Sequence, residues 1–86
     1  MIARMWEARV APGRLAAAEI WLRETAAADA RAAGAERVDA YRAASPDERL
    51  VLITHWADAP TWREPTPPDD LIERAHAWDF QELDLS

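Results

Sequence analysis

One long alanine-rich segment stands among short extended runs, and this order constrains the fold more than any other feature of the chain. Residues 14–33 have strong helix propensity, because alanine and arginine are favourable helix formers. Gly34 follows them at the point where a left-handed residue closes a helix without a steric clash. One stripe of the predicted helix has the i, i+3, i+4 spacing of buried residues, namely Leu15, Ala18, Leu22 and Ala26, widened by Trp21.

The remaining apolar runs predict strands. Residues 1–10 alternate between two sides, as the residues of a strand do. Residues 37–43 and 50–56 are predicted to form a hairpin across a type I turn at residues 45–48, which has proline in its second position. Residues 78–85 are predicted as the last strand.

The segment between the hairpin and the last strand is rich in proline. The four prolines from Pro60 to Pro68 prevent a long helix, because proline lacks an amide donor and clashes with the preceding turn. A short helix is predicted from Leu71 to His76, starting after Asp69 and Asp70. This segment is therefore expected to be a loop with a stub of helix.

Together these elements predict one ferredoxin-like α+β domain over residues 1–86. The order strand, helix, strand, strand, short helix, strand builds an antiparallel four-stranded sheet with its helices on one face. The second helix of this pattern is expected to be shortened.

Three of the four predicted strands carry apolar residues on both sides, whereas a lone sheet with one covered face should have a polar side. We expect Trp6, Trp56, Trp78 and Phe80 to share the uncovered face. Four such rings would bury roughly 150–250 Å² each, more than a monomer usually exposes as one patch. A second copy packing face to face would cover them and leave a ligand cavity at the aromatic end.

Composition excludes several classes of function. The chain has no cysteine and only two histidines, which argues against a disulfide framework or a metal cluster. Its net charge of −6 disfavours nucleic-acid binding, and no run approaches the roughly 20 apolar residues of a membrane span. Two glycines do not make a phosphate-binding loop. We expect a cytoplasmic protein without a membrane partner.

Three stretches resemble a known family. They are residues 1–10 with Pro12-Gly13, the helical Trp21-Leu22-Arg23-Glu24, and Ile53-Thr54-His55-Trp56-Ala57-Asp58 at the end of a strand. Each is similar to the corresponding part of antibiotic biosynthesis monooxygenase (ABM)-like proteins, of the dimeric α+β barrel superfamily.

The resemblance implies a homodimeric barrel with a pocket between sheet and helices. It also implies a choice of activities: cofactor-free oxygenation of polyketide-like aromatics, haem degradation, isomerisation, or none known. This chain contains no asparagine, so the Asn, Trp, His constellation of the haem-degrading branch cannot be assembled. The asparagine implicated in the polyketide branch is missing too. No cofactor is expected.

Cofactor-free oxygenation needs a base, a dry pocket and a donor for the resulting anion. His76 and Arg4 are the catalytic candidates, with His55 as another possible base. Each also has a structural interpretation. His76 would lie in the last helical turn and His55 in the sheet, and Arg4 would pair with a cross-strand carboxylate.

The candidate substrate-binding residues are aromatic, since flat rigid rings stack on planar ligands at small entropic cost. Packing in the core or in a dimer interface explains the same residues equally well. They are Trp6, Tyr41, Trp56, Trp62 and Trp78.

Two functions follow from these patterns. The first is a cofactor-independent monooxygenase acting on an aromatic or polyketide-like molecule. The alternative is a non-catalytic homodimer of the same fold that binds a small ligand or serves a structural role.

Overall fold

The computed structural model describes residues 1–44, 48–68 and 70–86. Most of the predicted turn at residues 45–48, and Asp69 at the predicted helix start, lie outside the described residues. The elements in chain order are β1 (Ile2–Val10), α1 (Leu15–Trp21), η1 (Leu22–Ala27), α2 (Ala28–Ala32), β2 (Arg37–Arg42), β3 (Arg49–Trp56) and β4 (Ile72–Gln81).

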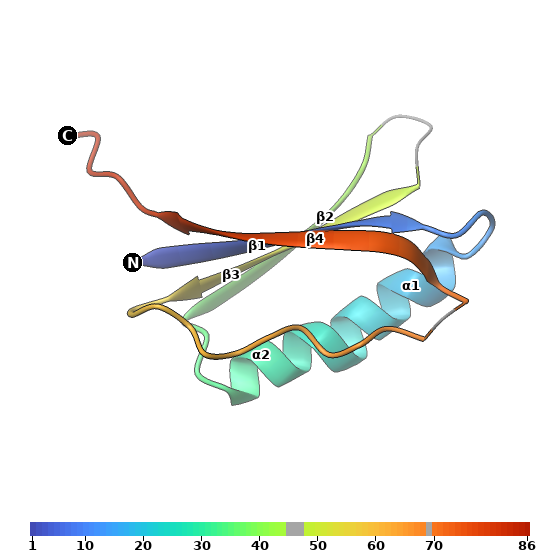
Figure 1. Cartoon of the computed structure of the whole chain (residues 1–86), viewed down its shortest axis with the longest axis horizontal. Helices are drawn as coiled ribbons and strands as arrows, with labels where there is room; N and C mark the ends of the chain where they lie inside the picture. Colours follow the sequence, from blue (N-terminus) through green and yellow to red (C-terminus); the bar gives the residue numbers. More distant parts are fainter. Residues whose placement is uncertain (45–47, 69) are drawn as a thin grey trace.

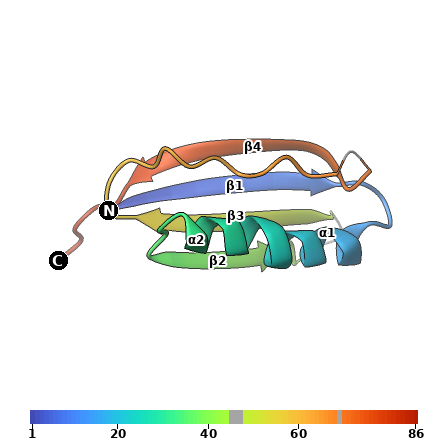
Figure 2. The same cartoon turned by 90° about the horizontal axis from the view of Figure 1, so that it is seen from below.

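The four strands form one antiparallel sheet in the order β2-β3-β1-β4 (Figure 1). This order, with a helix packed on one face, is compatible with the predicted ferredoxin-like fold. The antiparallel pairing of β2 with β3 agrees with the predicted hairpin. Figure 2 shows that the helix and the segment before β4 lie on the same face of the sheet.

The predicted helix over residues 14–33 is confirmed as one continuous helical run of three segments. α1 and α2 are α-helical, whereas η1 between them is π-helical. Ala18, Leu22 and Ala26 of the predicted stripe are buried against the sheet. Gly34 has a φ of 105° after the last turn, which is the left-handed closure expected there.

Replacing Gly34 by alanine should lower the free energy of unfolding by about 1 kcal/mol, because a Cβ is unfavourable at positive φ. No atom lies within 4 Å of the added Cβ, so the loss would come from the backbone alone. Urea unfolding followed by circular dichroism measures the change. An unaltered unfolding midpoint would contradict the role of Gly34 as the left-handed residue that closes the helix.

The predicted short helix from Leu71 to His76 is wrong. Ile72 begins a ten-residue strand, β4, which pairs with β1 from Val10 back to Ile2. Pairing along this whole length satisfies backbone N–H and C=O groups that a single helical turn would leave without hydrogen-bond partners. Tertiary context therefore overrides local helix propensity. The last strand consequently starts earlier than predicted and ends at Gln81.

The proline-rich segment contains no helix over residues 57–68, as the prolines predict. It crosses the sheet as an extended coil beside the helix, as Figure 2 shows. We call residues 57–68 the crossing coil. The coil occupies the layer in which a second helix would otherwise pack.

The prediction that four aromatic rings share one face is wrong. Trp6 and Trp56 face the helix and are 5% and 7% exposed, whereas Trp78 and Phe80 point to the opposite face and are 47% and 50% exposed. The cause is register: Trp78 pairs with Met5, not with Trp6. Because side chains alternate along a strand, one residue of register decides the face.

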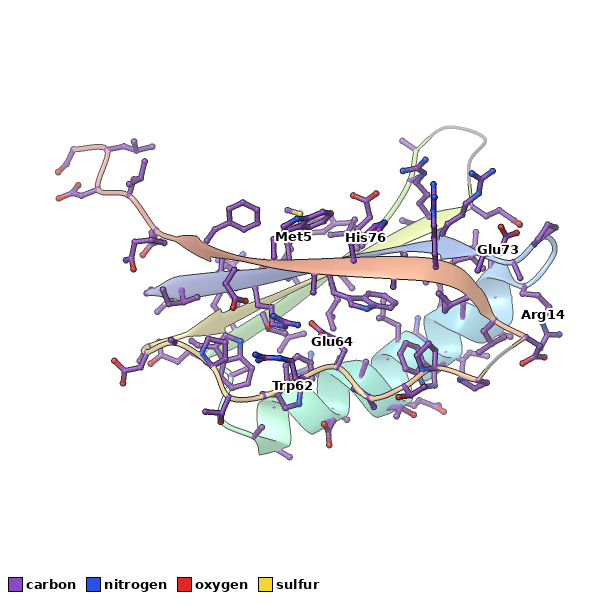
Figure 3. All side chains as sticks on the ribbon, viewed as in Figure 1. Met5, Arg14, Trp62, Glu64, Glu73 and His76 are labelled. Carbon is purple, nitrogen blue, oxygen red and sulfur yellow. The ribbon has the colours of Figure 1, made fainter. Side chains whose placement is uncertain are left out.

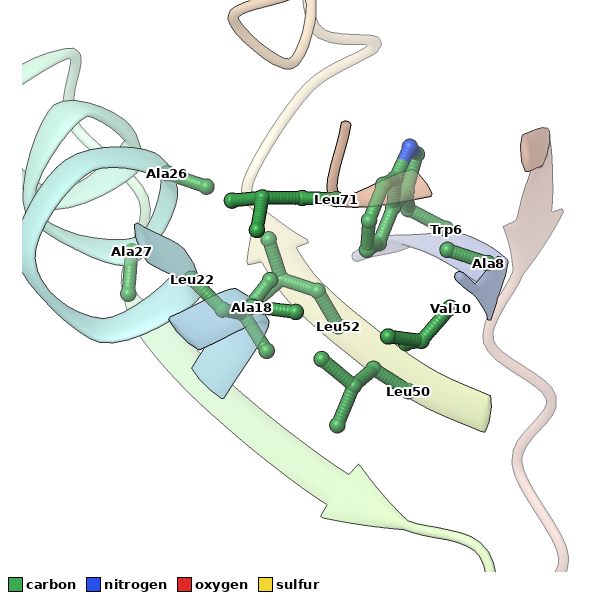
Figure 4. Packing of buried hydrophobic residues seen from close by; sticks show 10 residues of the cluster. All are labelled: Trp6, Ala8, Val10, Ala18, Leu22, Ala26, Ala27, Leu50, Leu52 and Leu71. Carbon is green, nitrogen blue, oxygen red and sulfur yellow. The ribbon is translucent and has the colours of Figure 1, made fainter. Parts of the chain in front are cut away.

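The core lies between the sheet and the helix, and Figure 4 shows its close packing. The strands and the helix supply most of its residues. Leu71, just before β4, also belongs to it, and Trp62 of the crossing coil packs against it. Its buried members are Trp6, Ala8, Val10, Ala18, Leu22, Ala26, Ala27, Leu50, Leu52 and Leu71.

Candidate functional site

The structure divides the predicted site residues among three places instead of gathering them. Arg4, Trp56 and Trp62 lie near one another on the helix side. His76 and Trp78 lie on the opposite face. Trp6 is a core residue that packs on Trp21, with ring centroids 5.9 Å apart.

Arg4 is held by two carboxylates. Glu64 of the crossing coil accepts hydrogen bonds from Nε and Nη2 at 2.8 and 2.9 Å, and Asp79 of β4 accepts one from Nη1 at 3.0 Å. The hydrogen bond to Glu64 is the main reason that the pKa of Arg4 is raised. The guanidinium is thus already engaged along its fork, in agreement with the structural interpretation of Arg4.

This cluster ties the crossing coil to the sheet. The side chains of Arg4 and Glu64 are only 9% and 8% exposed, so the pair is largely out of water. Figure 3 shows Glu64 on the coil, between the sheet and the helix. A buried pair of this kind fixes the path of the coil, because either charge alone would be costly to bury.

Trp56 and Trp62 form an aromatic pair next to this cluster. Their ring centroids lie 5.6 Å apart, and a shallow hollow of about 480 Å³ borders them, together with Gly34 and Asp58. The indole N–H of Trp56 donates to Thr54 and that of Trp62 donates to Asp29. Both polar groups are therefore satisfied within the chain, and only ring faces remain for a ligand.

The face of the sheet turned away from the helix, which we call the open face, has no cover among the described residues. Figure 3 shows Met5 and His76 pointing to this side. The strand registers place the following residues on it: Ala3, Met5, Glu7 and Arg9; Arg37, Asp39 and Tyr41; Arg49, Val51, Ile53 and His55; Arg74, His76, Trp78 and Phe80.

The open face changes in character along its length. Toward β4 its middle and one end are apolar, with Ile53, Met5 and Trp78 in one cross-strand row and Phe80 beside Ala3 in the next. Toward β2 the same two rows contain Asp39, Arg37 and His55. The other end holds Arg9, Arg49 and Arg74. Arg49 bonds Glu7 at 3.0 Å, and a small polar hollow of about 70 Å³ lies among these groups and His76.

His76 lies where these two regions meet, in a strand and not in the predicted helical turn. Its ring packs against Trp78, with centroids 5.6 Å apart, and its cross-strand neighbour is Glu7. His55 lies on the same face and approaches Asp39 at 3.3 Å. The sequence candidates His76 and Trp78 therefore do meet, but away from Arg4.

A further groove separates the helix from β2, and sequence reasoning missed all of it except Tyr41. We call it the β2 groove; its volume is about 270 Å³. Its floor is formed by Leu22, Ala27, Val38, Ala40 and Leu50. Its rim is formed by Glu19, Arg23, Arg31, Tyr41 and Arg42.

One signal in the sequence could have indicated this groove. Arg23, Ala27 and Arg31 are spaced at i, i+4 and i+8, which places two cations and a small residue along one helix face. The pattern reads as ordinary solvated helix surface until the position of β2 is known.

Among the described residues, no group of histidine and acidic side chains has the arrangement of a metal site. None of the helices described here is long and apolar enough to cross a membrane.

The sequence matches no protein-family model and no curated protein. The fold does match a solved structure, the crystal structure of PA3566 from Pseudomonas aeruginosa. The two share 16% sequence identity over 96% of this chain and 94% of that one, with a TM-score of 0.73. At this identity the likeness concerns the fold, so the chain is shown to be a small α+β protein with the architecture of PA3566.

Proposed function

We propose that the protein is an ABM-like homodimer in which two open faces pack together, and that the pair binds a small planar ligand without catalysing a reaction. The observation that carries this proposal is the exposed apolar part of the open face. Trp78 and Phe80, two residues apart on β4, are each about half exposed, at 47% and 50%. With Met5 and Ile53 in the row of Trp78, they form an apolar patch that no described residue covers, and such a patch marks a place where a partner or ligand binds.

The dimensions of the open face suit a second copy. Four strands about 4.8 Å apart and about eight residues long give a footprint of roughly 19 by 26 Å. Such a footprint is on the order of 500 Å² before side-chain relief is counted, close to the roughly 800 Å² per partner of a stable interface. The ion pairs of Glu7 with Arg49, at the polar end, and of Asp39 with Arg37, on the edge strand β2, suit the rim of an interface.

The ligand would lie at the apolar end, between the two sheets. Trp78 and Phe80 offer ring faces there, and a planar hydrophobic molecule gains most by stacking on such surfaces. Arg4 supports a binding role over catalysis, because Glu64 and Asp79 already engage its guanidinium. The guanidinium of Arg4, which the oxygenase hypothesis needs as the donor to an anionic intermediate, is thus bound to carboxylates of the chain itself.

Light scattering coupled to size exclusion tests the pairing, with twice the 9.7 kDa chain mass expected at micromolar concentration. A stable monomer at that concentration would contradict the proposal.

Ligand binding is tested by titrating the protein with a tricyclic anthrone and following tryptophan fluorescence. We expect saturable quenching that Trp78→Phe removes and Trp62→Phe retains, because Trp62 lies on the helix side. Equal quenching in both variants would place the ligand away from the open face.

A second candidate function is cofactor-independent oxygenation, which the contact of His76 with Trp78 favours. In the proposed dimer His76 would become a base in a dry apolar enclosure. It would take a proton from the anthrone carbon, and the carbanion would reduce O₂. One oxygen atom would enter the quinone product and the other would leave as water.

Oxygen uptake distinguishes the two functions. An oxygenase would accelerate uptake in the presence of the anthrone by at least about a hundredfold over the His76→Ala variant, the usual scale of general-base catalysis. Yield of the quinone should match the O₂ consumed. Saturable binding with uptake no faster than in buffer would support the non-catalytic module.

A further inference from the structure

The β2 groove combines an apolar floor with a cationic rim in a chain that is acidic overall. Three arginines and a single glutamate stand on its rim, whereas the whole chain carries a net charge of −6. A local excess of positive charge on a chain that is negative overall indicates that the groove would accept an anionic ligand.

The floor is open at Ala40, whereas Leu22, Ala27 and Leu50 are buried beneath it. Ala40 points to the helix side of β2, since its partner in β3 is Leu52, which is 1% exposed. Even so, Ala40 itself is exposed. The helix therefore does not cover this part of its own face of the sheet.

The helix is unusual along this groove. The π-helical η1 contributes Leu22, Arg23 and Ala27 to the lining. π-Helical turns are rare, and they occur frequently at functional sites because they displace side chains from regular α-helical positions. This observation is independent of the charges and points to the same place.

The rim arginines differ in their engagement. Arg42 forms two hydrogen bonds with Glu19, at 3.0 and 3.1 Å, which closes one end of the groove. Among the ion pairs between described residues, none involves Arg23 or Arg31. Two helical turns separate them, a rise of about 12 Å, so they flank the groove.

We propose that the β2 groove binds a small amphipathic monocarboxylate. Its apolar body would lie on Val38 and Ala40, the apolar lining residues that keep exposed surface, and its carboxylate would be bound by Arg23 or Arg31. An arginine fork matches the two oxygens of a carboxylate, and it stays charged at every physiological pH. The volume of about 270 Å³ is near the lower limit for small-molecule sites, which suits a short-chain or single-ring acid.

Apart from Tyr41, which is on the open face of the edge strand β2 and also borders the groove, this site lies on the opposite side of the sheet from the open face. It does not depend on pairing. Binding is tested with octanoate by isothermal titration calorimetry, with 1-octanol as the uncharged comparison. We expect octanoate to bind saturably. We expect 1-octanol to bind at least about tenfold more weakly than octanoate, because it cannot form the charge-assisted hydrogen bonds. Backbone NMR shifts should map to η1 and β2.

Two variants test the residues. Arg23→Gln combined with Arg31→Gln should weaken octanoate binding about tenfold or more, whereas Arg37→Gln, on the other face of β2, should leave it unchanged. Ala40→Phe should fill the groove and abolish binding. Because Ala40 is exposed, the thermal unfolding midpoint of the Ala40→Phe variant should stay close to that of the unmodified chain.

Three results would overturn the proposal: equal affinity for octanoate and 1-octanol, full binding by the double arginine variant, or NMR shifts confined to the open face. Light scattering on the same samples records pairing separately. A failed groove and a failed dimer are therefore distinguishable.

Discussion

Replacing Arg4 by methionine should lower the free energy of unfolding by about 3–5 kcal/mol, which is the usual cost of leaving a buried charge without its partner. Glu64, whose side chain is 8% exposed, would lose both of its hydrogen bonds to Arg4. A domain of this size has only about 5–15 kcal/mol of stability in total. We therefore expect a markedly lower urea midpoint.

The matched control is Arg14→Met. Arg14 bonds Asp70 at 2.7 Å, but their side chains are 44% and 68% exposed, and exposed pairs contribute about 0–1 kcal/mol. If Arg4→Met costs no more than Arg14→Met, the buried cluster does not hold the crossing coil in place.

A double variant tests the cause of the loss. Adding Glu64→Leu to Arg4→Met removes the orphaned charge, so a large part of the lost stability should return. Limited trypsin digestion offers a local measurement, since Arg4→Met alone should speed cleavage after Arg63 in the crossing coil more than after Arg49 in β3. Uniform acceleration across the chain would indicate general destabilisation instead.

Replacing Trp78 by glutamate should convert the proposed homodimer to a monomer. A tryptophan that anchors an interface contributes about 2 kcal/mol or more, and a twofold dimer contains it twice. About 4 kcal/mol corresponds to a roughly thousandfold weaker dimer. Trp78 is 47% exposed in the single chain, so the monomer should keep its fold.

Ile20→Glu is the matched control for this variant. Ile20 is 50% exposed and lies in α1, on the far side of the molecule from the open face. It also exchanges a large apolar residue for an acid. Light scattering from micromolar to millimolar concentration should show a dimer for Ile20→Glu and a monomer for Trp78→Glu. A dimer in both would place any interface elsewhere.

The sequence by itself determined the local elements. Alanine-rich residues 14–33 form a helix, Gly34 closes it, and the prolines from Pro60 to Pro68 prevent a second one. Each of these outcomes depends on backbone preferences of residues close together in the chain. Short-range sterics and hydrogen bonding decide them, so they can be predicted without knowledge of the fold.

The tertiary structure alone decided which residues meet. Cross-strand register put Trp78 on the open face and Trp6 in the core, and pairing with β1 made a strand of the segment predicted as a short helix. Arg4 meets Glu64 and Asp79 across 60 and 75 residues of chain. The β2 groove exists only because the helix passes β2 at a distance. Such contacts depend on how whole elements pack, and the alternation within one segment carries no information about its partner's register.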